Sequence, residues 1–126
     1  MIVTFVGIAG GTGNIIVAGN VPSTTTKGMV HSVLYLFTVN GKLIKRVKLE
    51  DTTNAMYVEN DRVVLGGANG SLEIRCTSGL STKHKLRLKS GVVSVSIDPR
   101  KQHLFVTTND GKMVIITSTA KPFVKK

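Results

Sequence analysis

Several residue types are rare or missing in this 126-residue chain, and each shortage narrows the possible structures. Tryptophan is absent and aromatic residues make up 5% of the sequence, which disfavours a stacking platform for single-stranded nucleic acid. The one cysteine, Cys76, cannot form an internal disulfide, and a lone thiol in an apolar strand is more often a core residue than a nucleophile. No apolar run reaches the roughly 18 residues of a membrane-spanning helix. The sequence therefore excludes a disulfide-stapled domain and a spanning helix within these residues.

Acidic residues are also scarce. Asp and Glu total 7 residues against 17 Lys and Arg residues, which gives a formal net charge of +10. Such a charge bears on partners and solubility rather than on the fold. The apolar start of the chain, residues 1–6, lacks the basic segment that begins a signal peptide, which favours a cytoplasmic location.

Two near-parallel segments, residues 61–74 and 102–115, are the most informative features that are present. Each contains an apolar strand, an Asn-Gly or Asp-Gly turn and a second apolar strand. The glycine of such a turn adopts the positive φ angle that a tight antiparallel hairpin needs. Gly70 and Gly111 lie 41 residues apart, and a hairpin that recurs every 40–45 residues or so, about one per blade, is typical of four-stranded propeller blades. Hairpin turns are predicted at Asn40 and Gly41, Asn69 and Gly70, and Asp110 and Gly111.

The predicted fold is all-β, built of antiparallel four-stranded propeller blades. About three blades are expected, over residues 1–51, 52–90 and 91–118, followed by a tail at 119–126 without a fourth strand. In the first blade, residues 19–32 are rich in Thr, Ser, Gly and Pro and are expected to form a loop. No segment has the periodicity or the caps of a helix. Because a closed ring takes roughly four to eight blades, we expect the chain to be part of a longer, here incomplete, propeller.

A glycine-rich turn near the start of the chain offers an alternative function. Gly10, Gly11 and Gly13 follow an apolar strand, as in an NAD(P)-binding oxidoreductase-like domain. A dinucleotide site also needs a helix N-terminus behind the glycines and an acidic residue about 20 positions later to hold the ribose. Here β-branched residues follow, and the first acidic residue is Glu50. A turn between two strands, with no cofactor, is the favoured interpretation.

Catalytic and metal-binding residues are not predicted. His31, His84 and His103 fall in a loop, an outer strand and a turn, without Cys or carboxylate partners at metal-ligand spacing. Asp110 precedes a glycine and is interpreted as a turn residue. No nucleophile and base can be assembled from local context, so we expect a non-enzymatic protein.

Basic residues alternate with other residues along two predicted outer strands. Alternation places them on one face of a strand. There they either guard the exposed edge against pairing with other strands or contact an anionic lipid surface or an acidic protein partner. A basic nucleic-acid-binding module is a further alternative, disfavoured because no aromatic residues interleave the basic ones. The candidate contact residues are Lys83, Lys85, Arg87 and Lys89 in one strand and Lys42, Arg46 and Lys48 in the other.

Three segments follow one another in the order found in a known protein family. Residues 33–44 contain a hydrophobic strand, a Thr-Val-Asn-Gly-Lys turn and a second strand, residues 62–70 follow as one blade, and residues 93–115 as the last. In this order, over residues 15–117, the chain resembles the C-terminal WD40 propeller of BEACH-domain proteins, especially the neurobeachin and neurobeachin-like family. The Trp-Asp dipeptide of regular WD40 repeats is missing.

The resemblance implies a large cytoplasmic scaffold that is peripherally attached to membranes and acts in vesicle trafficking and protein sorting. In that family the WD40 propeller is a surface for protein–protein interaction, so the implied partners are proteins. The resemblance also implies that further blades and a BEACH domain belong to the full chain.

Overall fold

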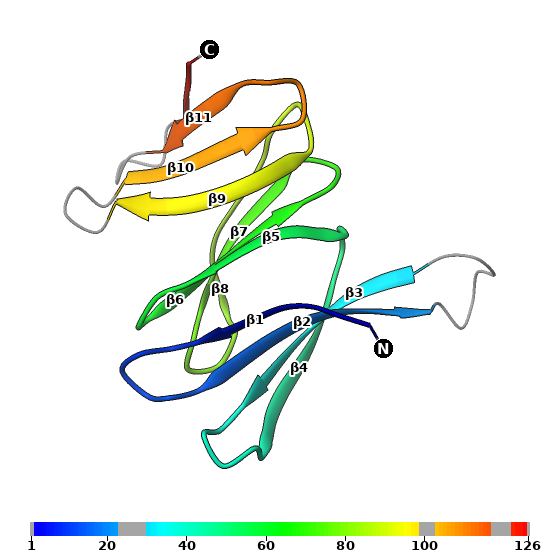
Figure 1. The fold of residues 1–126 in the computed structure, drawn as a ribbon, viewed down its shortest axis with the longest axis vertical. Coiled ribbons are helices and arrows are strands. Elements are labelled where there is room, and N and C mark those ends of the chain that lie inside the picture. The colour runs from blue at the N-terminus through cyan, green and yellow to red at the C-terminus, as the bar shows by residue number, and fades with distance from the viewer. Residues whose placement is uncertain (1, 23–29, 99–102, 117–121, 126) are drawn as a thin grey trace.

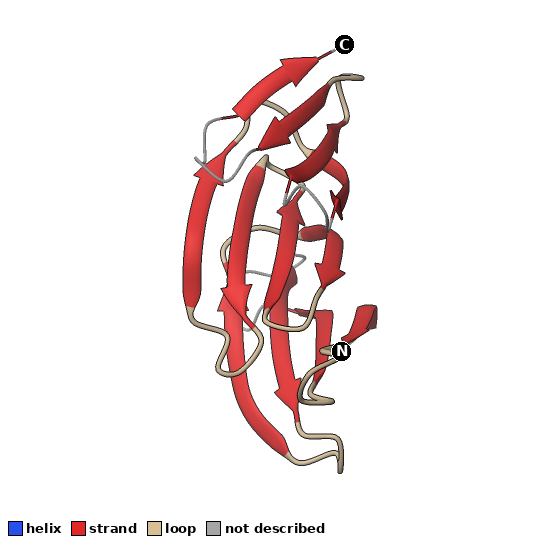
Figure 2. Cartoon of the chain, turned by 90° about the vertical axis from the view of Figure 1, so that its left-hand side faces the viewer, coloured by secondary structure: helices blue, strands red, loops and turns tan. Residues whose placement is uncertain are grey.

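The computed structural model of the chain describes residues 2–22, 30–98, 103–116 and 122–125. Within these residues, twelve strands form three antiparallel sheets of four strands each, and no helix is present (Figure 1, Figure 2). The described residues therefore include no helix that is long and apolar enough to cross a membrane. The prediction of an all-β fold built of antiparallel four-stranded units is confirmed.

Each sheet is a meander in which every strand pairs with its neighbour in sequence, and we call the sheets blades 1 to 3. Blade 1 consists of β1 (Ile2–Ile8), β2 (Ile15–Pro22), β3 (Val30–Phe37) and β4 (Leu43–Leu49). Blade 2 consists of β5 (Thr53–Val58), β6 (Arg62–Gly67), β7 (Ser71–Cys76) and β8 (Thr82–Arg87). Blade 3 consists of β9 (Val92–Asp98), β10 (His103–Thr108), β11 (Met113–Ile116) and β12 (Pro122–Lys125).

A glycine with a positive φ angle lies in each of the three predicted hairpin turns. Gly41, Gly70 and Gly111 have φ angles of 85°, 94° and 83°, which glycine adopts without the steric cost of a Cβ atom. The three turns share one hydrogen bond. Gly41 N–H donates to Thr38 O over 2.9 Å, Gly70 N–H to Gly67 O over 3.1 Å and Gly111 N–H to Thr108 O over 3.1 Å.

The blades stack through their first strands. β1 contacts β5 and β5 contacts β9, so β4, β8 and β12 lie at the outer edges of the sheets (Figure 1). Between blades 1 and 2, Ile16, Leu34 and Leu36 pack against Val63 and Leu65. The core between blades 2 and 3 contains Ala55, Val64, Leu72, Val92, Ile97, Leu104, Val106, Val114 and Ile116. Burial of these apolar side chains is the main force that holds one blade on the next.

Alternation along the strands leaves one face of blade 1 and one face of blade 3 without a neighbouring blade among the described residues. Leu34 and Leu36 are fully buried toward blade 2, whereas Tyr35 between them belongs to the open face. For the same reason Val17 and Phe105, which an apolar pattern alone would place in the core, are only partly buried.

The segment 19–32 contains more strand than its composition predicts. β2 and β3 extend into it, and Asn20 pairs with Ser32 within the ladder. Their side chains also interact, because Ser32 Oγ donates to Asn20 Oδ1 over 3.0 Å and accepts from Thr53 N over 2.9 Å. Because the polar side chains of Asn20 and Ser32 form a hydrogen bond with each other, both residues can lie in strands. The predicted loop is therefore too long at both ends. Residues 23–29 lie outside the described residues.

The third sheet has a fourth strand where the sequence predicts a tail. β12 lies within residues 119–126 and pairs antiparallel with β11, from Ile116 opposite Pro122 to Met113 opposite Lys125. The prediction of no fourth strand is wrong. Pro122 does not prevent pairing because it is the first residue of an edge strand, where a missing N–H group is tolerated.

Candidate functional site

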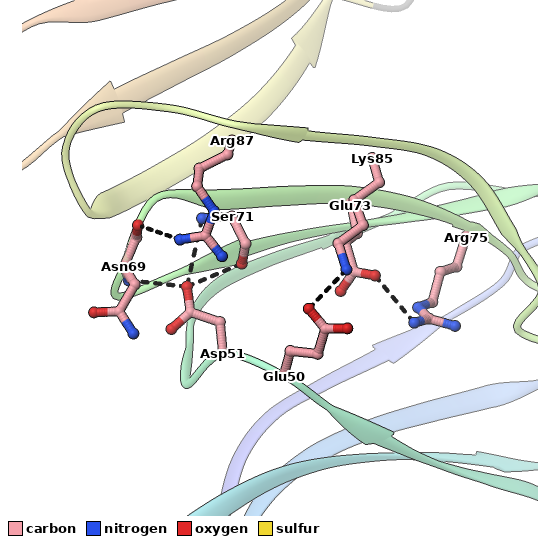
Figure 3. Close-up of polar contacts among 8 residues, drawn as sticks. All are labelled: Glu50, Asp51, Asn69, Ser71, Glu73, Arg75, Lys85 and Arg87. Carbon is pink, nitrogen blue, oxygen red and sulfur yellow. Dashed lines mark hydrogen bonds and ion pairs between the residues drawn. The ribbon is translucent and has the colours of Figure 1, made fainter.

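A buried carboxylate organises the turn between β6 and β7. Asp51, in the link between blades 1 and 2, is 7% exposed. Its Oδ2 atom accepts hydrogen bonds from Asn69 N at 2.8 Å and from Ser71 Oγ at 2.9 Å (Figure 3). A Cβ atom on Gly67 would overlap this oxygen. The carboxylate therefore occupies the space that a side chain would fill, and its role is to hold the turn against the link.

Two ion pairs continue this polar cluster along β7 and β8 (Figure 3). Glu73 Oε1 lies 3.0 Å from Arg75 Nη2, and both side chains are mostly buried. Lys85 Nζ lies 2.9 Å from Glu50 Oε2 in a more exposed pair. The hydrogen bond from Lys85 lowers the pKa of the Glu50 carboxyl. Both acids thus have a basic partner inside the chain.

The four basic residues predicted to form a row along β8 are all exposed, but they do not share one environment. Lys85 has an acidic partner, and Arg87 Nη1 donates to Asn69 O over 3.2 Å. β8 ends at Arg87, so Lys89 lies beyond the strand. A register shift between β7 and β8 interrupts the alternation near Lys83. Their contact with an anionic surface stays a prediction.

The second basic group lies at the outer strand of blade 1. Arg46 and Lys48 occupy β4 opposite Tyr35 and Val33 of β3, and Lys42 precedes the strand. The Arg46 guanidinium carbon lies 5.8 Å from the centroid of the Tyr35 ring, within the range of a cation–π contact. Because Tyr35 belongs to the open face of blade 1, this cation lies on that face too.

A pocket of about 350 Å³ opens between blades 2 and 3. One side comes from the residues around the end of β8, and the other from β11 and the hairpin that leads into it. Leu88 and Val114 supply apolar surface, whereas Arg87, Lys89 and Lys112 supply positive charge. The pocket thus combines an apolar part with a cationic rim.

One acidic residue, Asp110, also lines this pocket. Its carboxylate accepts a hydrogen bond from Thr108 Oγ1, which with a further hydrogen bond from Ser90 lowers the pKa of Asp110. Lys112 Nζ lies 3.9 Å from Asp110 Oδ2. Three cationic side chains therefore oppose a single carboxylate. Sequence reasoning missed Lys112 as a site residue, because only the stacking of blade 3 on blade 2 brings it beside β8.

The glycine-rich turn at the start of the chain connects two antiparallel strands, β1 and β2, rather than a strand and a helix. Gly13 N–H donates to Ala9 O over 2.8 Å and closes the turn. A Cβ atom on Gly10 would overlap Asn60 Oδ1 of blade 2, so a neighbouring turn occupies the space beside the glycines. A dinucleotide needs backbone N–H groups at a helix N-terminus. The geometry therefore does not support the NAD(P)-binding alternative, which also depends on Gly11.

The histidines and the cysteine are dispersed. His31 and His103 belong to β3 and β10 rather than to a loop and a turn, and His84 lies in β8. Among the described residues, no three His, Cys, Asp or Glu side chains are grouped so that they could hold a metal ion. Cys76, expected in the core, is partly exposed at the end of β7, where its hydrogen bond with Ser78 lowers the pKa of the thiol.

The arrangement of the three blades is similar to that in solved structures of WD40 propellers. No protein-family model matches the sequence. The structure of Sqt1 from Saccharomyces cerevisiae superposes with a TM-score of 0.75 at 17% sequence identity, over 97% of this chain and 34% of Sqt1. The structure of HIRA(644–1017) superposes with a TM-score of 0.65 at 16% identity, over 94% of this chain and 36% of that chain. This chain thus spans about a third of the length of each, and its three sheets have the fold of WD40-type β-propeller blades.

Proposed function

We propose that the chain is a non-enzymatic protein-interaction module that forms three blades of a longer WD40-type propeller. The observation that carries the proposed further blades is the open face of blade 1. Val6 and Ile8 of β1 are 62% and 64% exposed there, although blades 1 and 2 bury similar side chains between them. Large apolar side chains grouped on one exposed face are typical of surfaces that contact protein.

The outer part of the same face carries aromatic and cationic side chains. The rings of Tyr35 and Phe37 are stacked with their centroids 6.2 Å apart, and Arg46 Nε lies 3.4 Å from Tyr35 Oη. Tyrosine, phenylalanine and arginine are enriched in protein interfaces. Another blade of the same protein would cover such a face, and the threefold greater length of the Sqt1 and HIRA chains supports this occupant.

A more specific form of the proposal places the chain in the C-terminal propeller of a BEACH-type scaffold of the neurobeachin-like family. Such a scaffold acts in vesicle trafficking and protein sorting, in the cytoplasm, and is attached peripherally to membranes. The support is the collinear resemblance over residues 15–117, in which residues 33–44 and 62–70 fall in successive blades. The proposed partners are proteins, with an anionic membrane surface as a second contact.

Sequencing the transcript upstream of the codon for Met1 tests this proposal. The reading frame should continue into further four-stranded repeats and, before them, a BEACH domain. A verified in-frame stop codon directly before Met1, together with a stable and monomeric 126-residue product, would contradict it.

A further inference from the structure

We infer that the pocket between blades 2 and 3 binds an acidic linear peptide of a protein partner. An apolar side chain of the peptide contacts Leu88 and Val114, and its carboxylates pair with Arg87, Lys89 and Lys112. The inference rests on the proposed interaction function, because it names the chemistry of the partner that one surface of the module takes.

The apolar part of the pocket is held in place by packing and by backbone hydrogen bonds. Val114 is buried in the core between blades 2 and 3, and Leu88 packs against that core. Leu88 N–H donates to Gly70 O over 2.7 Å, and Asn109 N–H donates to Gly91 O over 2.9 Å, which ties the β10–β11 hairpin to the link after β8. The volume of about 350 Å³ lies near the lower end of the range of about 300–1,000 Å³ for ligand sites. The pocket thus suits a side chain and its flanking backbone.

The charge around the pocket is not balanced from within. Arg87 and Lys89 have no carboxylate at ion-pair distance in the part of the chain that the structure describes. Asp110 is already engaged by its own hairpin and by the longer contact with Lys112. Arg87 uses Nη1 for Asn69 O, which leaves other guanidinium N–H groups to donate to a carboxylate. An acidic ligand would therefore supply the missing negative charge.

The shape and the lining of the pocket favour a peptide over other anions. A bilayer presents its headgroups as a broad surface, which a recess between two sheets contacts poorly. None of the lining residues is aromatic, so nucleic-acid bases find no stacking surface. An acidic peptide with one apolar side chain matches both the cationic rim and the apolar part.

The test is fluorescence anisotropy with the full-length protein and a short fluorescein-labelled peptide in which a central leucine is flanked by aspartate and glutamate. The double variant Lys89→Glu/Lys112→Glu should bind about tenfold or more weakly, because two attractive contacts become repulsive. The matched control Lys45→Glu lies on β4 of blade 1 and changes the net charge as much as Lys89→Glu alone does. It should change affinity less than about twofold in physiological salt. A peptide with serine in place of leucine should bind about tenfold more weakly to the wild-type protein.

Equal weakening by Lys89→Glu and Lys45→Glu, or unchanged binding by the double pocket variant, would overturn the inference. So would loss of phosphatidylserine-vesicle binding in the pocket variant while the wild-type protein ignores the peptide, because the pocket would then take lipid. If Lys112→Glu disturbs the hairpin, as circular dichroism would reveal, Lys89→Glu alone should weaken peptide binding about threefold. None of these results bears on the open face of blade 1, which separate variants test.

Discussion

Gly70 must be glycine for two reasons, its positive φ angle and the lack of space for a Cβ atom. Its φ angle of 94° lies in the left-handed region, and a Cβ atom there would overlap the carbonyl oxygen of Leu88. Gly41 has a similar φ angle of 85° but open space around it. The turn of blade 2 and the wall of the peptide pocket therefore depend on the same residue.

Replacing Gly70 should cost more stability than replacing Gly41. Both Gly→Ala variants place a Cβ atom at positive φ, which costs about 1–2 kcal/mol, and only Gly70→Ala also forces the backbone around Leu88 to move. We expect losses in the free energy of unfolding of about 3 kcal/mol for Gly70→Ala and about 1 kcal/mol for Gly41→Ala. Urea unfolding followed by circular dichroism measures both losses. Equal losses would show that the backbone at Leu88 can move away from the new Cβ atom without an energetic penalty.

Two adjacent acidic residues should differ in their contribution to stability. Asp51→Ala leaves the partly buried Asn69 N–H and the buried Ser71 hydroxyl without an acceptor, which should lower the free energy of unfolding by about 2 kcal/mol. Glu50→Gln should have only a small effect at neutral pH, because the pair with Lys85 is exposed. The pKa of Glu50 is lowered in the folded state, so this small contribution is present above the unfolded pKa and is lost as pH falls through the folded pKa. Thermal unfolding of wild type and Glu50→Gln should therefore converge in acid, and a difference that persists there would contradict the ion pair.

At the scale of strands, the sequence predicts the pairing best where two strands are adjacent in the sequence and joined by a short turn. An Asn-Gly or Asp-Gly pair between two apolar runs located three hairpins, because these two residues themselves favour the backbone conformation of the turn. Composition was misleading at 19–32, where the polar pair of Asn20 and Ser32 belongs to a ladder. The four-residue strand β12 was missed because, unlike the equally short β11, it does not follow an Asn-Gly or Asp-Gly pair. Lys89 and Lys112 line the same pocket from its two sides, although they are far apart in the sequence. No local sequence pattern predicts that they lie close together.

The lysines of β4 should protect an exposed edge. β4 is the outermost strand of blade 1, and Lys45 and Lys48 are exposed on it. Charges on an edge strand oppose pairing with strands of other molecules. Lys45→Thr/Lys48→Thr should therefore aggregate faster than wild type in light-scattering assays, and Lys45→Glu/Lys48→Glu should not. Equal aggregation of the two variants would show that charge at this edge has no such role.

At the scale of the whole molecule, the stack of blades has two dissimilar ends. The open face of blade 1 carries Val6 and Ile8. The open face of blade 3 is more polar, with Ser94 Oγ and Thr107 Oγ1 at hydrogen-bond distance beside the partly exposed Phe105. A partner that covers one end would therefore not fit the other equally well.

The open face of blade 1 should tolerate a charge that the core does not. Ile8 is 64% exposed, whereas Ile16 is fully buried. Ile8→Glu should reduce self-association and the binding of an apolar dye without lowering the unfolding temperature. Ile16→Glu should abolish cooperative unfolding, because it buries a carboxylate without a partner. Calorimetry and analytical ultracentrifugation measure both effects, and loss of stability in Ile8→Glu would show that this face is already covered.

Within the described residues, no strand pairs outside its own blade. Every backbone ladder therefore closes between segments that are neighbours along the chain, which keeps the contact order of each sheet low and makes the stack nearly one-dimensional. A ribosome delivers the strands of one blade before those of the next. Folding during synthesis can then proceed in one direction, with each new blade covering the apolar side that the previous blade left exposed.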